Sequence, residues 1–170
     1  MLSTIKKRRS IRDFLEKEVE EEKLQEILKA AMFSPSARHI DPWEFLVVKD
    51  KNIIKKLCDS CVFSSFFEKA PIVIVIVADE SKSDYWVEDS AIAAENIYLE
   101  VTNQGLGTCY IQIRDASGEV KEKEKYVREV FSVPDNIRIQ CLMPIGYPAE
   151  YPGEHSNQEF DESKIHWDEF

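Results

Sequence analysis

The sequence predicts one domain of mixed α and β structure, in which helices cover both faces of a sheet. The run Ile-Val-Ile-Val-Ile-Val between Pro71 and Ala78 is apolar at every position, which is typical of a central strand buried on both sides. Apolar residues at helical spacing over 19–33 and 85–104 predict two amphipathic helices. The 170 residues, of which 44% are hydrophobic, are enough to bury roughly 70% of the unfolded surface.

The other elements follow from local spacing and from the residues that begin or end them. Glu20–Glu22 place negative charge in the first turn of the 19–33 helix, where it is favourable. Gly105 and Gly107 end the long helix. The expected helices span residues 2–7, 19–33, about 52–61, 85–104 and 119–131, the last stopped by Pro134, and the expected strands span 43–49, 71–78, 108–113 and 137–145.

Residues 148–170 form a polar tail that nevertheless ends in apolar side chains. Ile165, Trp167 and Phe170 lie in its last six positions. Because a disordered tail rarely keeps such residues, we expect it to dock on the body of the same chain or on a second subunit.

The N-terminus lacks the apolar run of a signal peptide, since Met1–Ile5 leads directly into lysines and arginines. The longest strongly apolar run, 70–78, is too short to span a bilayer. We therefore expect a soluble, cytoplasmic protein without a membrane partner.

Cys58 and Cys61 have the CxxC spacing of redox and zinc sites. A second CxxC and a nearby histidine are missing, so we expect no metal site and a reduced, structural pair, with a redox role as the alternative. Cys109 and Cys141 lie in apolar runs and are expected in the core.

Residues 6–12 concentrate five basic side chains and one serine in a chain whose net charge is −10. Arg8, Ser10 and Arg12 alternate, so in an extended segment they project from one side while Ile11 turns toward apolar packing. Arginine and serine donors suit a phosphate. The alternatives are a solvated helix end or a weak nucleic-acid patch; the second is weakened because no other basic stripe appears.

Four separated stretches carry a resemblance over essentially the full length. They are Arg-Arg-Ser-Ile-Arg-Asp-Phe at 8–14, Ser-Pro-Ser-Ala at 34–37 with Pro-Trp-Glu-Phe at 42–45, Gly-Leu-Gly-Thr-Cys-Tyr-Ile at 105–111, and Ile-Gly-Tyr-Pro-Ala-Glu at 145–150. In this order and at these distances, they resemble the small FMN-dependent nitroreductases.

The resemblance implies an α+β fold, with a central mixed β-sheet surrounded by helices, in an intertwined homodimer that has FMN at the subunit interface. The tail would embrace the neighbouring subunit. By the same resemblance, Arg8 and Ser10 hold the phosphate and ribityl chain and Arg9 assists. Arg12 lies near the pyrimidine edge of the flavin, where positive charge favours reduction.

The resemblance also places residues on both sides of the flavin ring. These are Pro35, Ser36 and Ala37 from the partner subunit on one side, and Tyr110, Ile111 and Gln112 on the other, with the Gln112 backbone N–H directed at flavin N5. The alternative for Tyr110 and Ile111 is ordinary packing within a strand.

The chain departs from the family pattern in three ways. His39 stands where asparagine is usual, and it remains a candidate flavin ligand because histidine can donate a hydrogen bond. Asp41 replaces glutamine and is expected to pair with Arg38 or His39. Where relatives carry basic residues after the last stretch, this chain has His155 and Asn157, so His155 is a candidate phosphate ligand and FMN affinity could be pH-sensitive.

The implied activity is that of an FMN-dependent oxidoreductase. NADH or NADPH, a transient reductant, passes hydride to flavin N5, and an electron-poor acceptor such as a nitroaromatic or quinone then takes its place in ping-pong order. No side chain is expected to act as a nucleophile. The alternatives are a flavin reductase of another acceptor class, a non-catalytic flavin-binding or storage protein, and a nucleic-acid-binding module.

Overall fold

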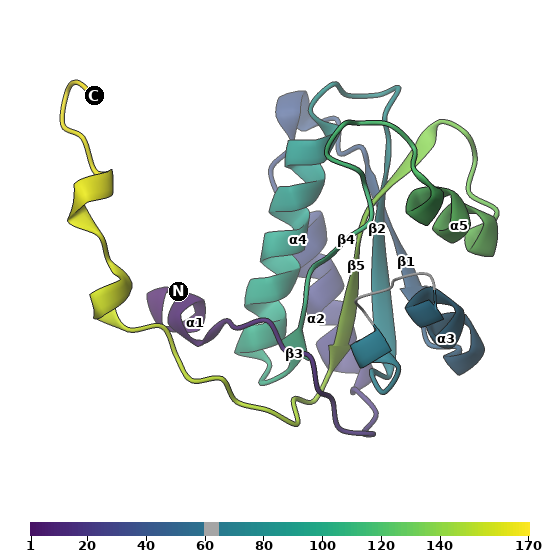
Figure 1. The fold of residues 1–170 in the computed structure, drawn as a ribbon, viewed down its shortest axis with the longest axis horizontal. Coiled ribbons are helices and arrows are strands. Elements are labelled where there is room, and N and C mark those ends of the chain that lie inside the picture. The colour runs from purple at the N-terminus through teal and green to yellow at the C-terminus, as the bar shows by residue number, and fades with distance from the viewer. Residues whose placement is uncertain (60–64) are drawn as a thin grey trace.

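The computed structural model describes residues 1–59 and 65–170. Its helices are α1 (Leu2–Lys7), α2 (Glu21–Met32), α3 (Lys51–Asp59), α4 (Trp86–Asn103) and α5 (Glu122–Phe131), and its strands are β1 (Trp43–Val48), β2 (Ile72–Asp79), β3 (Gly107–Thr108), β4 (Ile111–Gln112) and β5 (Ile137–Gly146) (Figure 1). The predicted helices and strands are present with small differences at their ends, except that the strand predicted over 108–113 is divided into β3 and β4. The predicted end of the third helix, at Cys61, falls outside the described residues.

The strands form one sheet in the order β1-β2-β5-β3, and β4 pairs with the same edge of β5 as β3. β2 is buried at every position, as its apolar sequence predicts for a strand covered on both faces. All strand ladders in the described chain are antiparallel, and the parallel contribution is an isolated bridge between Ser10 and Thr108. Within one chain, the expected mixed sheet is thus an antiparallel sheet with one parallel bridge.

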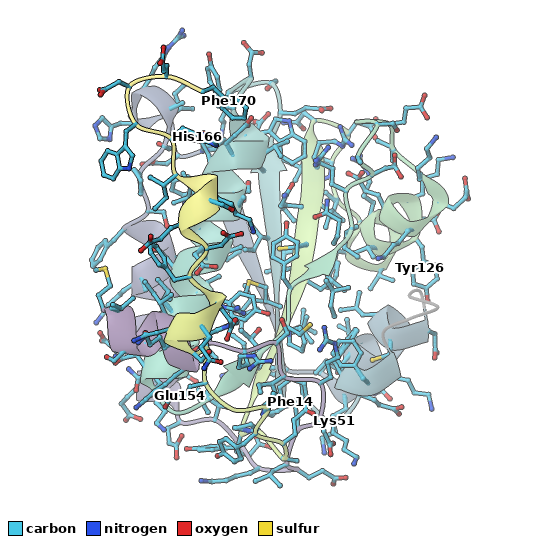
Figure 2. All side chains as sticks on the ribbon, turned by 60° about the vertical axis from the view of Figure 1, so that its left-hand side comes forward. Phe14, Lys51, Tyr126, Glu154, His166 and Phe170 are labelled. Atoms are coloured by element: carbon cyan, nitrogen blue, oxygen red, sulfur yellow. The ribbon has the colours of Figure 1, made fainter. Side chains whose placement is uncertain are left out.

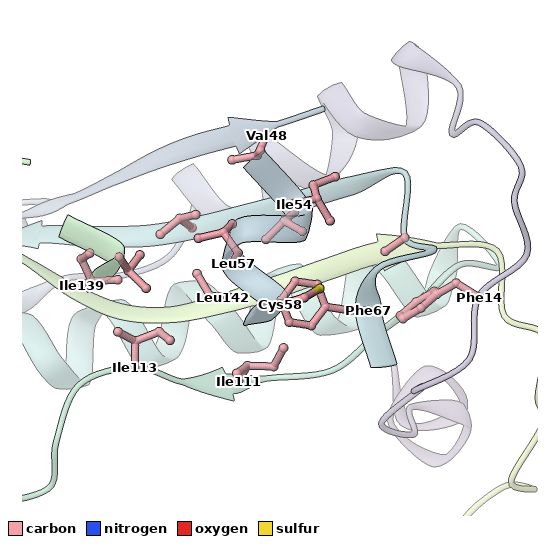
Figure 3. Packing of buried hydrophobic residues seen from close by; sticks show 14 of the residues in the cluster. Phe14, Val48, Ile54, Leu57, Cys58, Phe67, Ile111, Ile113, Ile139 and Leu142 are labelled. Carbon is pink, nitrogen blue, oxygen red and sulfur yellow. The ribbon is translucent and has the colours of Figure 1, made fainter. Parts of the chain in front are cut away.

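Helices cover both faces of this sheet (Figure 1). α2 and α4 pack together on one face, where alternate β2 residues such as Ile74 and Ile76 meet Ile97 of α4. α3 and α5 lie on the other face, over a second cluster that includes Leu57, Val127 and Leu142 (Figure 3). The pleat of β2 therefore supplies both cores.

The predicted strand over 108–113 is divided into two short strands. β3 and β4 share one register against β5, and that register places Cys109 opposite Pro144. Ile113 N–H donates to the Gln140 carbonyl, so residues 113, 111 and 109 occupy the hydrogen-bonded positions of the ladder. Pro144 has no N–H to donate, and the ladder is interrupted there.

The charged helix begins three residues later than predicted and ends where it was predicted to end. α5 begins at Glu122 and ends at Phe131, and its C-cap residue Ser132 has a left-handed φ of 51°, before Pro134 is reached. Glu124 of this helix is buried and receives two hydrogen bonds from Arg138, at 2.8 and 3.0 Å, together with the Ile139 N–H at 3.1 Å. These hydrogen bonds hold the pKa of Arg138 above its usual range. The buried pair attaches α5 to β5.

The tail after β5 stands clear of the body for most of its length (Figure 1). Seen from that side in Figure 2, His166 and Phe170 lie near its end. Its apolar side chains are exposed, Trp167 at 82% and Phe160 at 65%. Within the described residues, none of the helices has the length and apolar character that crossing a bilayer requires.

Candidate functional site

The basic segment lines an open hollow of about 450 Å³. Its walls are Arg8, Arg9, Ser10 and Arg12 with Glu150 and Pro152. Helix α1 ends at Lys7, and its C-cap residue Arg8, with φ and ψ of −60° and 116°, begins an extended segment. The alternation expected from the sequence is present, because Ile11 is buried between the side chains that face the hollow.

Ile11 fixes the position of this segment against β3. Its N–H donates to the Thr108 carbonyl at 2.9 Å. Its side chain lies directly over Gly107, where an added Cβ would stand 2.7 Å from Ile11 Cγ1. Gly107 therefore permits the close approach that brings Ser10 and Arg12 to the sheet edge.

The arginines lie among partners from the C-terminal tail. Arg9 donates to the Gly153 carbonyl at 2.8 Å. An Arg8 Nη lies 3.4 Å from His155 Nε2, and His155 Nδ1 lies 2.6 Å from a Glu159 carboxylate oxygen. Because Arg8 can only donate, His155 Nε2 accepts and Nδ1–H donates to Glu159. The structure therefore brings His155 to the basic segment, where both of its ring nitrogens are engaged by protein groups, and its role as a phosphate ligand stays a prediction.

Tyr98 of α4 lies beneath the hollow and was missed as a candidate by the sequence analysis. Its hydroxyl is 2.8 Å from Ser10 Oγ and accepts the Tyr110 backbone N–H at 3.2 Å. Its ring lies under the Arg8 guanidinium, whose carbon is 5.0 Å from the ring centroid. Burial raises the pKa of Tyr98. The available signal was a hydroxyl on an otherwise apolar helix face.

The residues 110–112 lie along the same sheet edge. Ile111 is buried in the core, and the Tyr110 hydroxyl accepts from Gln140 at 2.8 Å. Burial raises the pKa of Tyr110. Both side chains thus contact the protein itself, which agrees with the alternative of ordinary packing within a strand. Only the backbone of this segment is then free to contact a ligand.

The backbone of Gln112 is directed away from β5. Since 111 and 113 occupy hydrogen-bonded positions, 112 occupies a non-hydrogen-bonded one, and its N–H and C=O point to the outer edge. The same alternation sends the Tyr110 N–H to Tyr98. The Gln112 carbonyl accepts from Lys123 on this side. An outward N–H of Gln112 is the orientation that the prediction for flavin N5 requires.

The predicted residues Pro35, Ser36, Ala37 and His39 follow Ser34, whose hydroxyl accepts from Asn96 of α4 at 2.8 Å. The Ala37 N–H donates to Asp89 in the first turn of that helix, at 2.9 Å. Asp89 and Tyr98 are nine positions apart, which is about 13 Å along a helix at 1.5 Å per residue. Within one chain, Ala37 therefore lies well away from the Tyr98 hydroxyl and Ser10.

The turn at 36–41 has its own internal structure. Arg38, His39 and Asp41 have left-handed φ values of 57°, 53° and 49°. Asp41 accepts from the Ser36 hydroxyl at 2.5 Å, and its N–H donates back to that oxygen at 3.0 Å. The expected pairing of Asp41 with Arg38 or His39 was therefore wrong, because Ser36 is nearer in the turn.

The cysteines lie away from this hollow or beneath it. Cys58 and Cys141 are buried in the core, and Cys61 is outside the described residues. Cys109 is buried next to the hollow, and burial raises the pKa of its thiol. In the described ranges, no group of three or more histidine, cysteine, aspartate or glutamate side chains is placed to hold a metal ion.

Comparisons with known proteins agree with this geometry. The model of the nitroreductase family matches residues 5–62 and 60–147. A protein of Methanothermobacter thermautotrophicus, provisionally named NADH dehydrogenase/NAD(P)H nitroreductase, is 34% identical over 98% of this chain and 85% of its own. An NADH dehydrogenase of Thermus thermophilus is 41% identical over 86% of each chain.

A solved structure extends the agreement to the fold. The FMN-dependent nitroreductase of Clostridium difficile R20291 superposes with a TM-score of 0.94 at 40% identity, covering all of both chains. The α+β fold is therefore that of these enzymes, with the basic segment and the 105–112 edge within the matched range. This chain belongs to the nitroreductase family.

Proposed function

We propose that this protein is an NAD(P)H-dependent oxidoreductase that uses FMN as its bound cofactor. The observation that carries the proposal is the position of two groups along one sheet edge: a hollow lined by arginines and Ser10, and the outward backbone N–H of Gln112. One group suits a phosphate and the other suits an acceptor atom on a flat ring. Named relatives share both the chemistry and the fold.

The residues present fit the phosphate end of FMN. Arg8, Arg9 and Arg12 supply positive charge, and Ser10 supplies a short donor. Glu150 also lines the hollow, where its carboxylate accepts the Arg12 N–H at 2.5 Å. That hydrogen bond holds Glu150 at the Arg12 end, so the phosphate would be bound mainly by Arg8 and Ser10, with Arg9 at its outer side and His155 acting through its contact with Arg8.

The residues also fit the ring end. Bound there, FMN supplies a hydride acceptor at N5, which links NADH or NADPH to an electron-poor acceptor. The Gln112 N–H would orient that atom, and the strand is fixed by the buried Ile111 side chain and by the hydrogen bond of the half-buried Tyr110 with Gln140. Arg12 places positive charge near the pyrimidine edge, where negative charge gathers on reduction. No side chain has to act as a nucleophile.

The proposal includes a homodimer. The first part of the tail is attached to helix α1, because the His155 backbone N–H donates to the Lys6 carbonyl at 2.8 Å. Beyond this point Phe160, Trp167 and Phe170 are exposed, and a second subunit would cover them. The same partner would bring its Pro35, Ser36, Ala37 and His39 to the flavin. Residues 1–170 would thus form one domain whose 148–170 tail embraces the partner.

Anaerobic titration tests the function. The purified protein, loaded with FMN, is mixed with NADH or NADPH under nitrogen, and loss of the yellow absorbance is followed. Bleaching, followed by recovery on addition of a nitroaromatic or a quinone, supports an oxidoreductase with ping-pong kinetics. Bleaching without recovery by either acceptor points to a flavin reductase of another acceptor class. A stable yellow spectrum with both nicotinamides would leave a flavin-binding or storage protein as the function.

The homodimer is tested by mass measurement in solution. The full chain and a chain ending at Glu159 are compared by light scattering at equal concentration. A dimer that becomes a monomer when residues 160–170 are removed supports the proposed role of the tail. A full-length monomer that still binds FMN would contradict a flavin site shared between subunits.

A further inference from the structure

We propose that Tyr98 is a positioning residue that sets Ser10 and Arg8 for a phosphate, and so makes the site prefer FMN to riboflavin. This inference rests on the proposed function, since it concerns the phosphate end of the same cofactor. Tyr98 comes from α4, whereas Ser10 and Arg8 come from the N-terminal segment. Tyr98 thus links α4 to the two residues proposed to bind the phosphate, Ser10 and Arg8, and also to the strand proposed to face the flavin ring.

The hydrogen bonds at Tyr98 have a defined direction once a phosphate is present. The Tyr110 backbone N–H can only donate, so the Tyr98 oxygen accepts it, at 3.2 Å. An ionised phosphate oxygen can only accept, so the Ser10 O–H donates a hydrogen bond to the phosphate. The Tyr98 O–H then donates to Ser10 Oγ across 2.8 Å. The chain runs from Tyr110 N–H through Tyr98 and Ser10 to the phosphate, and each bond polarises the next.

The Tyr98 ring has a separate effect on Arg8. The guanidinium carbon lies 5.0 Å from the ring centroid, within the range of a cation–π contact. The other partner of this guanidinium is His155, at 3.4 Å. Arg8 is thus held between a ring from α4 and an imidazole from the tail, which leaves its remaining N–H groups directed into the hollow.

Burial keeps this arrangement rigid. Tyr98 is 5% exposed, and its neighbours Ile97 and Val101 are fully buried on α4. Water therefore does not replace the Tyr98 hydroxyl as a partner of Ser10 from below. A phenylalanine at this position would keep the ring under Arg8 and remove only the hydroxyl. A leucine would remove both, so two variants separate the two effects.

The experiment measures the dissociation constants of FMN and riboflavin by quenching of flavin fluorescence. In wild type, FMN binds more tightly than riboflavin. Tyr98→Phe is expected to reduce this preference about five- to tenfold, the effect of one hydrogen bond between neutral groups. Tyr98→Leu is expected to reduce it further, by about threefold. Tyr85→Phe, at the exposed N-terminal end of the same helix, is the control and should leave the preference unchanged.

A double mutant distinguishes positioning from general destabilisation. In a Ser10→Ala background, Tyr98→Phe should change the FMN preference no further, because the hydroxyl acts through Ser10. An equal weakening of FMN and riboflavin by Tyr98→Phe, or an unchanged effect in the Ser10→Ala background, would overturn the inference. A wild-type protein that binds neither flavin would refute the proposed function itself, and the inference with it.

Discussion

Gly107→Ala gives the most direct test of how the basic segment is held. The added Cβ would lie 2.7, 2.8 and 2.9 Å from three atoms of Ile11. Carbon atoms in contact prefer about 3.5 Å or more, so the two elements must separate by roughly 0.8 Å. That shift is enough to stretch the 2.8 Å bond between Ser10 and Tyr98 beyond normal hydrogen-bond length.

The expected cost is that of inserting a methyl group into a packed site, about 1–3 kcal/mol of unfolding free energy. For a chain of this size, such a loss lowers Tm by about 2–4 °C per kcal/mol. Thermal denaturation of the FMN-free protein measures this loss, and fluorescence titration measures FMN affinity, which we expect to fall about tenfold. Both effects have one cause, the displacement of Ile11 from β3.

Gly105→Ala is the matched control for this substitution. Gly105 lies in the same connection, but nothing is within 4 Å of its added Cβ, and its φ of 72° is the only source of strain. We expect a loss of about 1–2 kcal/mol from the left-handed conformation, with FMN affinity unchanged. If Gly107→Ala kept wild-type Tm and FMN affinity, the close approach of Ile11 would not position the segment, and the reasoning would be refuted.

Three further predictions concern the arginines, the buried ion pair and pH. Arg8→Ala should weaken FMN about 10- to 100-fold in a fluorescence titration, the loss expected for charge-assisted hydrogen bonds, and leave riboflavin unchanged; an equal loss for both flavins would contradict the assignment. Glu124→Ala removes the buried carboxylate partner of Arg138 but leaves it the Glu80 carboxylate at 2.8 Å, so urea denaturation should show a loss of about 1–3 kcal/mol, against little change for the exposed Glu119→Ala. The hydrogen bond from His155 lowers the pKa of Glu159 below its ordinary 4.5. Folding therefore favours the carboxylate, and its contribution is present above pH 4.5 and lost as pH falls through the lower folded value. In thermal melts, the Tm of the wild type should fall as the pH is lowered below 4.5, and Glu159→Gln should show a smaller dependence of Tm on pH.

Local sequence patterns predicted the features that depend on residues close together in the chain. The apolar run of β2 predicted burial on both faces, and the alternation around Ile11 predicted which side chains face the hollow. The interruption at Cys109 depended on Pro144, which lies 35 positions away and becomes its opposite only through the strand register. A propensity at either residue alone carries no information about that pairing.

The site was predicted through a resemblance, and its supporting residue was missed for a physical reason. Tyr98 occupies a core-facing position of α4, where an aromatic side chain satisfies the helical pattern without reference to its hydroxyl. Its role depends on contacts with Ser10 and Tyr110, at 88 and 12 positions' distance. The predicted partner of Asp41 was wrong for a similar reason, because the backbone geometry of the turn decided that the Ser36 hydroxyl is the nearest donor.

The order of the strands has a consequence for the protein during its synthesis. β2 is central, yet one of its two neighbours, β5, is synthesised only after α4, β3, β4 and α5. At about 5–20 residues per second, the roughly 60 residues between them take several seconds to make. For that time the apolar β2 has an open edge that can pair with another nascent chain. Expression at lower temperature or with added chaperone should therefore raise the yield of this protein by protecting that strand.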